Sequence, residues 1–280
     1  MQMKVTGKKS NGNTLDGNGL VLSGDDCLLI ESELVNGNWE VPENVTIKNF
    51  VIDKGSIRLV GLGLNGQGDL VKESSRNKNH TEYCQSAAPR NIIFENITVK
   101  ANKRIPFYVG PGCTNITLRN SKLTGSSVAT AIYLDCESAN NLIENNIIET
   151  KVNREMLALD GSAYNVIRGN VFVNPNLGGI YLYRNSGEGG TVRHQSPIKN
   201  TIENNTFKYS VIGKAMSLIH PTIWVGSRSS FMQYFYFYRD EDKGYKFGSS
   251  INNEDLASGN KIKNNKPAGI HIRNWEVSKK

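Results

Sequence analysis

Long apolar runs are missing from this 280-residue sequence: none approaches the roughly 18 residues of a membrane-spanning helix, which excludes a transmembrane protein. Cysteine is also scarce, and the four present, Cys27, Cys84, Cys113 and Cys136, are too few for a disulfide scaffold. No two of them form a Cys-x-x-Cys pair, and the histidines have no metal-ligand spacing, so neither a metal nor another cofactor is expected. The disulfide state of the cysteines stays open.

Acidic residues are outnumbered: 33 Lys and Arg stand against 26 Asp and Glu, which gives a net charge of +7. Such a balance is typical of proteins that bind nucleic acid, an anionic surface or an acidic polymer, although it also serves simply to keep a protein soluble. The sequence has no helix-turn-helix pattern, zinc-finger spacing or dense Lys/Arg stretch. Nucleic acid is therefore not an expected partner.

Hydrophobic residues make up 38% of the chain, which is enough for a real core and excludes wholesale disorder. Asparagine is abundant, at about one residue in eight, and favours turns over helices. No signal-peptide pattern opens the chain, so the sequence does not decide between a secreted, a periplasmic and a virion-associated protein.

One phrase recurs along the chain, with asparagine at its start and again five residues later. It reads NVTIKN at 44–49, NIIFEN at 91–96, NITLRN at 115–120, NLIENN at 141–146, NVIRGN at 165–170, NTIENN at 200–205 and NKIKNN at 260–265. The basic period is near 24 residues, with three longer intervals. Each phrase alternates as a short strand bounded by turn residues does, whereas a helical period is absent.

A second short strand follows four of these phrases: FYV at 107–109, IYL at 132–134, LAL at 157–159 and IYL at 180–182. Two or three short strands per 24 residues, without helices between them, describe one coil of a parallel β-helix. The sequence therefore predicts an all-β, single-domain parallel β-helix solenoid over residues 1–280, with inserted loops at about 62–90, 185–196 and 220–258. Within the last loop, residues 231–248 alternate aromatic and polar residues and are expected to form a hairpin.

Equivalent residues of successive coils should stack on one another. Asparagine suits such a column because it tolerates left-handed backbone and its amide can hydrogen-bond to the next amide. The predicted ladder consists of Asn49, Asn96, Asn120, Asn146, Asn170, Asn205 and Asn265. Over residues 40–275 the pattern resembles the right-handed parallel β-helix of the pectate-lyase-like superfamily, whose members are mostly polysaccharide lyases, glycoside hydrolases, epimerases and phage tailspikes.

Residues between the inward-facing positions should point outward and form two columns. One contains Tyr108, Tyr133, Ala158 and Tyr181, with Arg58 one coil before them, and the other contains Gly110, Asp135, Asp160 and Tyr183. Because coils lie about 4.8 Å apart, Asp135 and Asp160 should lie roughly 5 Å from each other, at least partly solvated, and one of them could act as an acid. That separation is typical of a retaining glycosidase. The alternative is that these aspartates cap turns.

The Gly-rich segment YRNSGEGGTVRHQSP at 183–197 follows directly and places Arg184, Glu188, Arg193 and His194 beside Asp160. Two arginines can hold a carboxylate or sulfate, His194 can act as a base, and Glu188 can orient it or act as an acid. A solvated, salt-bridged loop is the alternative interpretation.

Two local resemblances add to this picture. Residues 191–207, TVRHQSPIKNTIENNTF, are similar to the Arg-His segment of the alginate lyase and chondroitinase B family, with Arg193 and His194 as the matching pair. GDDCLLIES at 24–32 is similar to the GDDC segment of the polygalacturonase family, in which the paired aspartates are catalytic. The second resemblance implies that role for Asp25 and Asp26, outside the favoured site.

These residues predict a polysaccharide-processing enzyme, a glycoside hydrolase or a polysaccharide lyase, that cleaves glycosidic bonds of an acidic glycan in an outer groove. Asp135 and Asp160 form its carboxylate pair, and Glu188 and His194 assist proton transfer. The expected substrate contacts are Arg58, Tyr108, Tyr133, Tyr181, Tyr183, Arg184 and Arg193. Two alternatives stay open: a non-catalytic glycan-binding or structural solenoid, such as a piece of a phage tailspike or an adhesin, and a uronate epimerase. The tailspike analogy implies a homotrimer.

Overall fold

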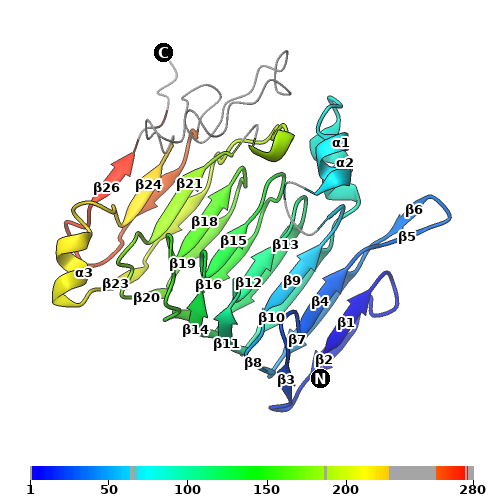
Figure 1. Cartoon of the computed structure of the whole chain (residues 1–280), viewed down its shortest axis with the longest axis horizontal. Coiled ribbons are helices and arrows are strands. Elements are labelled where there is room, and N and C mark those ends of the chain that lie inside the picture. Colours follow the sequence, from blue (N-terminus) through cyan, green and yellow to red (C-terminus); the bar gives the residue numbers. More distant parts are fainter. Residues whose placement is uncertain are drawn as a thin grey trace.

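The computed structural model describes residues 2–63, 66, 68–185, 188–226, 257–274 and 276. Over these residues the chain winds through three parallel sheets that run the length of the molecule (Figure 1). Sheet A contains β1 (Met3–Thr6), β4 (Leu28–Glu31), β9 (Ile57–Val60), β12 (Phe107–Val109), β15 (Ile132–Leu134), β18 (Leu157–Asp160), β21 (Ile180–Tyr183), β24 (Ile223–Val225) and β26 (Ile272–Asn274). Sheet B contains β2 (Thr14–Asp16), β7 (Glu43–Lys48), β10 (Arg90–Glu95), β13 (Thr114–Arg119), β16 (Leu142–Glu144), β19 (Val166–Arg168), β22 (Thr201–Glu203) and β25 (Lys261–Lys263).

Sheet C completes each coil. It contains β3 (Val21–Ser23), β8 (Val51–Asp53), β11 (Thr98–Lys103), β14 (Lys122–Ser127), β17 (Ile147–Ile148), β20 (Val171–Val173) and β23 (Thr206–Lys208). One coil passes through sheets B, C and A in turn, as β10, β11 and β12 do, and the next coil repeats the path in register. The predicted parallel β-helix is confirmed.

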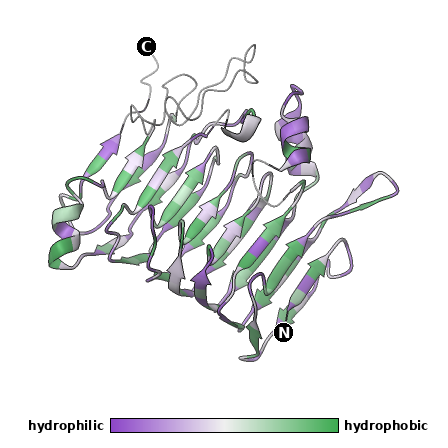
Figure 2. Ribbon diagram, in the orientation of Figure 1, coloured by the Kyte–Doolittle hydropathy of each residue, from purple (hydrophilic) through white to green (hydrophobic). Residues whose placement is uncertain are grey.

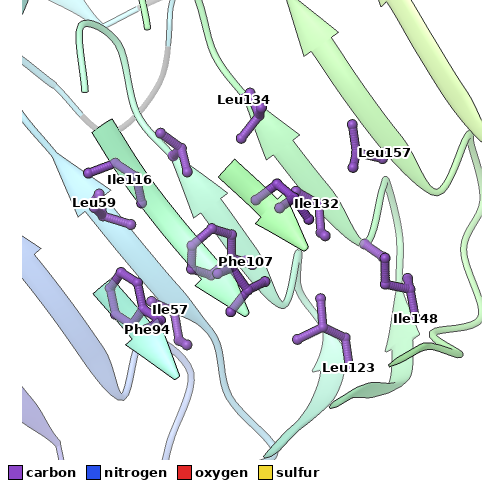
Figure 3. Packing of buried hydrophobic residues seen from close by; sticks show 14 of the residues in the cluster. Ile57, Leu59, Phe94, Phe107, Ile116, Leu123, Ile132, Leu134, Ile148 and Leu157 are labelled. Carbon is purple, nitrogen blue, oxygen red and sulfur yellow. The ribbon is translucent and has the colours of Figure 1, made fainter. Parts of the chain in front are cut away.

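The core is the inside of this coil. Phe107, Ile132, Leu157 and Ile180 pair in register across β12, β15, β18 and β21 and are fully buried. Figure 3 shows such columns from the three sheets meeting in the interior. Because side chains alternate between the two faces of a strand, the residues between these positions must point out of the coil. The predicted inward and outward positions are therefore confirmed for sheet A.

The asparagine ladder differs from the prediction in its first half. Pairing of Arg119 with Glu144 aligns Asn120 with Asn145, one residue before Asn146. Asn120 and Asn145 have positive φ angles of 52° and 55°, so they supply left-handed turn backbone. The predicted column thus merged two neighbouring columns: Asn49, Asn96 and Asn120 belong to the turn, and Asn146, Asn170, Asn205 and Asn265 form the buried amide ladder. Within the turn column one predicted amide contact is present, because Asn96 Nδ2 donates to Asn49 Oδ1 at 2.7 Å.

A second amide ladder lies at the other end of the sheet B strands. Its members, each hydrogen-bonded through the side chain to the next, are Asn141, Asn165, Asn200 and Asn260. In the earlier coils the same inward positions are apolar, as at Ile92 and Ile116. The solenoid therefore changes from hydrophobic turns to hydrogen-bonded asparagine turns at the coil that contains β16.

The outer face of sheet B carries a column of alternating charge. The paired positions in chain order are Asp16, Lys48, Glu95, Arg119, Glu144, Arg168, Glu203 and Lys263. Four ion pairs form within it, including Arg168 with Glu144 at 2.7 Å and Lys263 with Glu203 at 3.0 Å. We call this column the charge ladder. Neighbouring charges in it have opposite signs, which favours the native register, because shifting a strand by one coil would place like charges opposite each other.

The insertions carry the remaining elements. Residues 61–89 contain α1 (Asp69–Ser74) and α2 (His80–Ser86), and a 3-10 turn spans Glu188–Gly190. The third insertion was predicted to begin at 220, but residues 223–225 form β24, in register with β21; the expected hairpin at 231–248 lies outside the described residues. The antiparallel hairpin β5 (Glu33–Val35) and β6 (Asn38–Glu40) and the helix α3 (Val211–Met216) project from the coils (Figure 1). None of the described helices is long and apolar enough to cross a membrane.

Candidate functional site

Asp135 and Asp160 lie on the outer face of sheet A, as predicted, but solvent does not reach them. Their exposed fractions are 2% and 0%. The insertion between β9 and β10 covers Asp135, whose Oδ2 accepts a hydrogen bond from the Gly66 amide at 2.8 Å. The loop after β21 covers Asp160, which accepts from the backbone and side-chain nitrogens of Asn185 at 2.8 and 2.9 Å. The prediction that Asp160 is at least partly solvated was therefore wrong.

Arg193 lies between the two carboxylates and is itself buried. Its Nη1 pairs with Asp160 Oδ2, and its Nη2 lies 3.7 Å from Asp135 Oδ1. Burial raises the pKa of Asp135 even though the Arg193 charge opposes that shift. The guanidinium charge offsets the repulsion between the two aspartates, so removing the charge of Asp160 should not stabilise the fold.

Two tyrosines complete this buried cluster. The hydroxyl of Tyr108 donates to Asp135, and that of Tyr133 donates to Asp160. Burial, reinforced by the neighbouring carboxylate charges, raises the pKa of both phenols well above its usual value, so both remain protonated donors. Each aspartate thus has its acceptor positions filled by tyrosine, backbone and arginine donors. The cluster therefore holds the insertion that contains Gly66 and the loop that contains Asn185 against sheet A.

The remaining residues of the 183–197 segment face other partners. Arg184 and Arg193 were predicted to contact substrate, but both are buried. Arg184 donates to the backbone carbonyl of Arg193 at 3.2 Å. The His194 ring contacts the Ser75 carbonyl, with Nε2 at 2.9 Å, and packs against the His80 ring, so its partners lie in the insertion that contains α1 and α2. Glu188 begins the 3-10 turn, and its side chain lies outside the described part of the structure.

Glu137 is a buried carboxylate that sequence reasoning missed. It accepts hydrogen bonds from the Thr81 hydroxyl on α2, from the His194 amide at 2.7 Å and from the Gln195 amide at 3.2 Å. Burial is the main reason that its pKa is raised. His80 also lies close, with its Nε2 3.9 Å from Glu137 Oε1. No periodic signal could have found this residue, because both of its partner segments are insertions.

Tyr108, Tyr181 and Tyr183 were expected to contact substrate, but all three are buried. Tyr181 packs against Trp224 with ring centroids 5.5 Å apart, and the Tyr183 hydroxyl donates to Glu155 Oε1 at 2.7 Å. Neither ring offers an open face for sugar stacking. The four cysteines are free and buried, and within the described ranges no group of three or more His, Cys, Asp or Glu side chains could hold a metal ion.

A partly accessible surface lies in the middle of sheet A, although the Tyr108 ring is buried and the Arg58 side chain is only 14% exposed. Arg58 pairs in register with Tyr108 and lies over its ring, 5.2 Å from the centroid. Tyr108 stacks on Tyr133 at 5.8 Å, and Tyr133 is only partly buried. Two half-exposed arginines, Arg104 and Arg154, lie at the edge where β12 and β18 begin. We call these five residues the Arg–Tyr face.

Arg104 and Arg154 were not predicted as site residues, although their positions in the sequence carry a signal. Each stands three residues before an inward-facing strand residue, Arg104 before Phe107 and Arg154 before Leu157. The structure gives them different partners: Arg104 Nη1 lies 3.1 Å from Asp26 Oδ1, and Arg154 Nη2 lies 3.1 Å from the Tyr183 hydroxyl. Both side chains are about two-fifths exposed, so they can still reach a ligand.

The aspartate pair of the GDDC segment borders this face. Asp26 Oδ1 accepts from Arg58 Nε at 2.7 Å, and Asp25 Oδ2 lies 3.6 Å from Arg104 Nη2. Both carboxylates are more accessible than Asp135 and Asp160. They hold the arginines in place on the open side of sheet A.

One of three comparisons with known proteins supports this architecture. A structure search gave the A-module of mannuronan C-5 epimerase AlgE6 from Azotobacter vinelandii, at 12% identity, with 99% of this chain and 86% of that chain covered and a TM-score of 0.19. So low a score carries no argument about function. A search of curated proteins found no match. Residues 34–222 match the family described as the right handed beta helix region, and together with the stacked parallel sheets this match shows that the chain belongs to the right-handed β-helix family.

Proposed function

We propose that the chain binds an acidic polysaccharide along the Arg–Tyr face. The observation that carries this proposal is the row formed by Arg58, Tyr108 and Tyr133, with a guanidinium over one ring and the next ring stacked in register. Arg104 and Arg154 add two half-exposed cations along the edge of the same row.

The chemistry of the row suits a chain of uronate sugars. A guanidinium binds a carboxylate through two parallel hydrogen bonds, and the partly exposed Tyr133 ring offers an apolar surface to a sugar ring. Coils repeat about every 4.8 Å, so cations and rings recur at a spacing close to the length of one sugar residue. The net charge of +7 would attract a polyanion from solution.

Binding is favoured over cleavage at the carboxylates first predicted to be catalytic. Asp135 and Asp160 are buried, paired with Arg193 and hydrogen-bonded by tyrosines. A general acid or base must reach the glycosidic oxygen, or the proton that it abstracts, within hydrogen-bonding distance. Cleavage by this pair would require the insertions that carry Gly66 and Asn185 to move away, and it stays a prediction.

Titration calorimetry with polygalacturonate, alginate and neutral dextran tests the proposal. We expect binding to the two polyuronates and none to dextran, and a loss of about tenfold or more in affinity for Arg58→Ala, because a charge-assisted hydrogen bond is worth about 1.5–3 kcal/mol. Arg168→Ala, which removes an exposed arginine from sheet B, is the matched control and should bind as the unaltered chain does. Equal affinities for Arg58→Ala and the control would refute the assignment.

The same samples separate binding from cleavage. A rise in absorbance near 235 nm indicates a lyase because elimination creates an unsaturated uronate, whereas release of reducing ends without that absorbance indicates hydrolysis. Bound polymer with neither signal is the result that the buried Asp135 and Asp160 predict.

A further inference from the structure

The four most exposed large hydrophobic side chains of the described residues lie within nine consecutive positions. Val211, Ile212, Leu218 and Ile219 are 91%, 75%, 74% and 67% exposed, ahead of Val128 at 62%. They form what we call the apolar corner, on α3 and the turns after it, which project from the coil beyond β23 (Figure 1). Figure 2 shows green, hydrophobic segments at this helix. Contiguous exposed apolar residues indicate an interaction site.

The local structure explains why these side chains point outward. Ser210 caps α3 by accepting from the Gly213 amide, and its own amide donates to Asn174 Oδ1 at 3.0 Å. Gly213 is buried, and a Cβ at this position would collide with Asn176 Oδ1, so this side of the helix must face the solenoid. At the other end, the Ser217 carbonyl contacts His271 Nδ1 at 2.9 Å. The opposite, apolar side is thereby held toward solvent.

The charged residues of the neighbouring segments are mostly basic, although Glu203, just before them, pairs with Lys263. Residues 204–226 and 257–274 contain six Lys and Arg and no Asp or Glu. Three exposed lysines come from the segments next to the corner: Lys208 at the end of β23, Lys214 on α3, and Lys266, which is bridged to β23 through the pairing with Thr206. Exposed apolar side chains flanked by lysines are typical of segments that lie in the interface of an anionic membrane.

We propose that the apolar corner docks on an anionic lipid bilayer. Val211, Ile212, Leu218 and Ile219 would enter the region between headgroups and acyl chains, and the three lysines would contact lipid phosphates. A second copy of the chain is a poorer occupant, because four side chains supply less than the roughly 800 Å² per partner of a standard interface. A bilayer needs no complementary shape. This inference is independent of the Arg–Tyr face.

Cosedimentation of the full chain with vesicles tests the proposal. We expect binding to phosphatidylcholine vesicles that contain phosphatidylglycerol, weaker binding to phosphatidylcholine alone, and weakening by salt. The quadruple variant with Val211, Ile212, Leu218 and Ile219 changed to serine should lose at least about tenfold in partitioning, since each buried CH₂ contributes about 0.8 kcal/mol. Replacing a lysine such as Lys214 by glutamine should lower partitioning about fivefold.

The control variant changes Val128 and Leu34, which are exposed on other parts of the solenoid, to serine and should partition as the unaltered chain does. All these positions are solvent-exposed, so thermal melts should show unchanged folding. Absence of binding to the anionic vesicles, or equal partitioning of the quadruple and control variants, would overturn the proposal. Light scattering gives a further test. If the unaltered chain and the control variant are oligomers and only the quadruple variant is a monomer, the apolar corner binds a second copy and the membrane proposal is overturned.

Discussion

Replacing Asn170 by alanine tests the amide ladder in the middle of the solenoid. The Asn170 side chain is fully buried and takes part in four hydrogen bonds. Its Oδ1 accepts from the backbone and side-chain nitrogens of Asn146, both at 3.0 Å. Its Nδ2 donates to the Ile143 carbonyl at 2.8 Å and to Asn205 Oδ1 at 3.0 Å. Alanine removes all four bonds at once and leaves their partners inside the coil.

The magnitude follows from these contacts. A buried hydrogen bond contributes about 1 kcal/mol net, and a buried group left without its partner costs about 1–3 kcal/mol. We therefore expect Asn170→Ala to lower the free energy of unfolding by about 4 kcal/mol. Urea titration followed by circular dichroism measures this difference.

Asn145→Gly, one coil earlier and exposed, is the matched control. Asn145 has a φ of 55°, a conformation that glycine adopts without strain, so its replacement should change the free energy of unfolding by no more than about 0.5 kcal/mol. A loss below about 1 kcal/mol for Asn170→Ala, or equal losses for the two variants, would refute the separation of the turn column from the amide ladder.

Three further predictions concern charge. Arg193→Met should lower the free energy of unfolding by about 3–5 kcal/mol, because two buried carboxylates lose their cation; a melting temperature equal to that of the unaltered chain would contradict this. Burial, and next to it the charge of His194, lowers the pKa of His80 to about 4, so the unfolded chain takes up a proton between about pH 6.5 and 4 that the folded chain does not. Stability should therefore fall by about 3 kcal/mol relative to His80→Asn as the pH drops across that window, and parallel pH profiles of the two proteins would rule out this assignment. Arg168→Glu places three negative charges in a row in the charge ladder and should cost about 1 kcal/mol at low salt, an effect that high salt should remove.

The coil itself could be predicted because its signal is periodic. The column of Phe107, Ile132 and Leu157 repeats at nearly constant spacing, and alternation along each strand then assigns the outward face. The asparagine ladder was predicted less well. The repeated phrase has asparagine at one or both of two neighbouring positions near its end, so Asn120 and Asn146 look equivalent in the sequence. Only the strand pairing distinguishes a left-handed turn residue from a buried amide.

Solvation of the candidate site could not be predicted. Asp135 and Asp160 follow the outward column as expected, but their burial depends on Gly66 and Asn185, which lie in insertions without a repeat. The same insertions carry Arg193, whose contact with both carboxylates joins segments more than thirty residues apart. Contacts of this kind depend on how a loop folds back on a sheet, and hydrophobic periodicity contains no information about that.

A crystal structure of the chain with an acidic oligosaccharide tests the central claim most directly. We predict sugar density along sheet A, with carboxylates at Arg58 and Arg104 and a ring over Tyr133, while Asp135 and Asp160 stay buried beneath their insertions. Density on the outer faces of sheets B or C, or a displaced insertion that brings Asp160 against a glycosidic oxygen, would contradict the account.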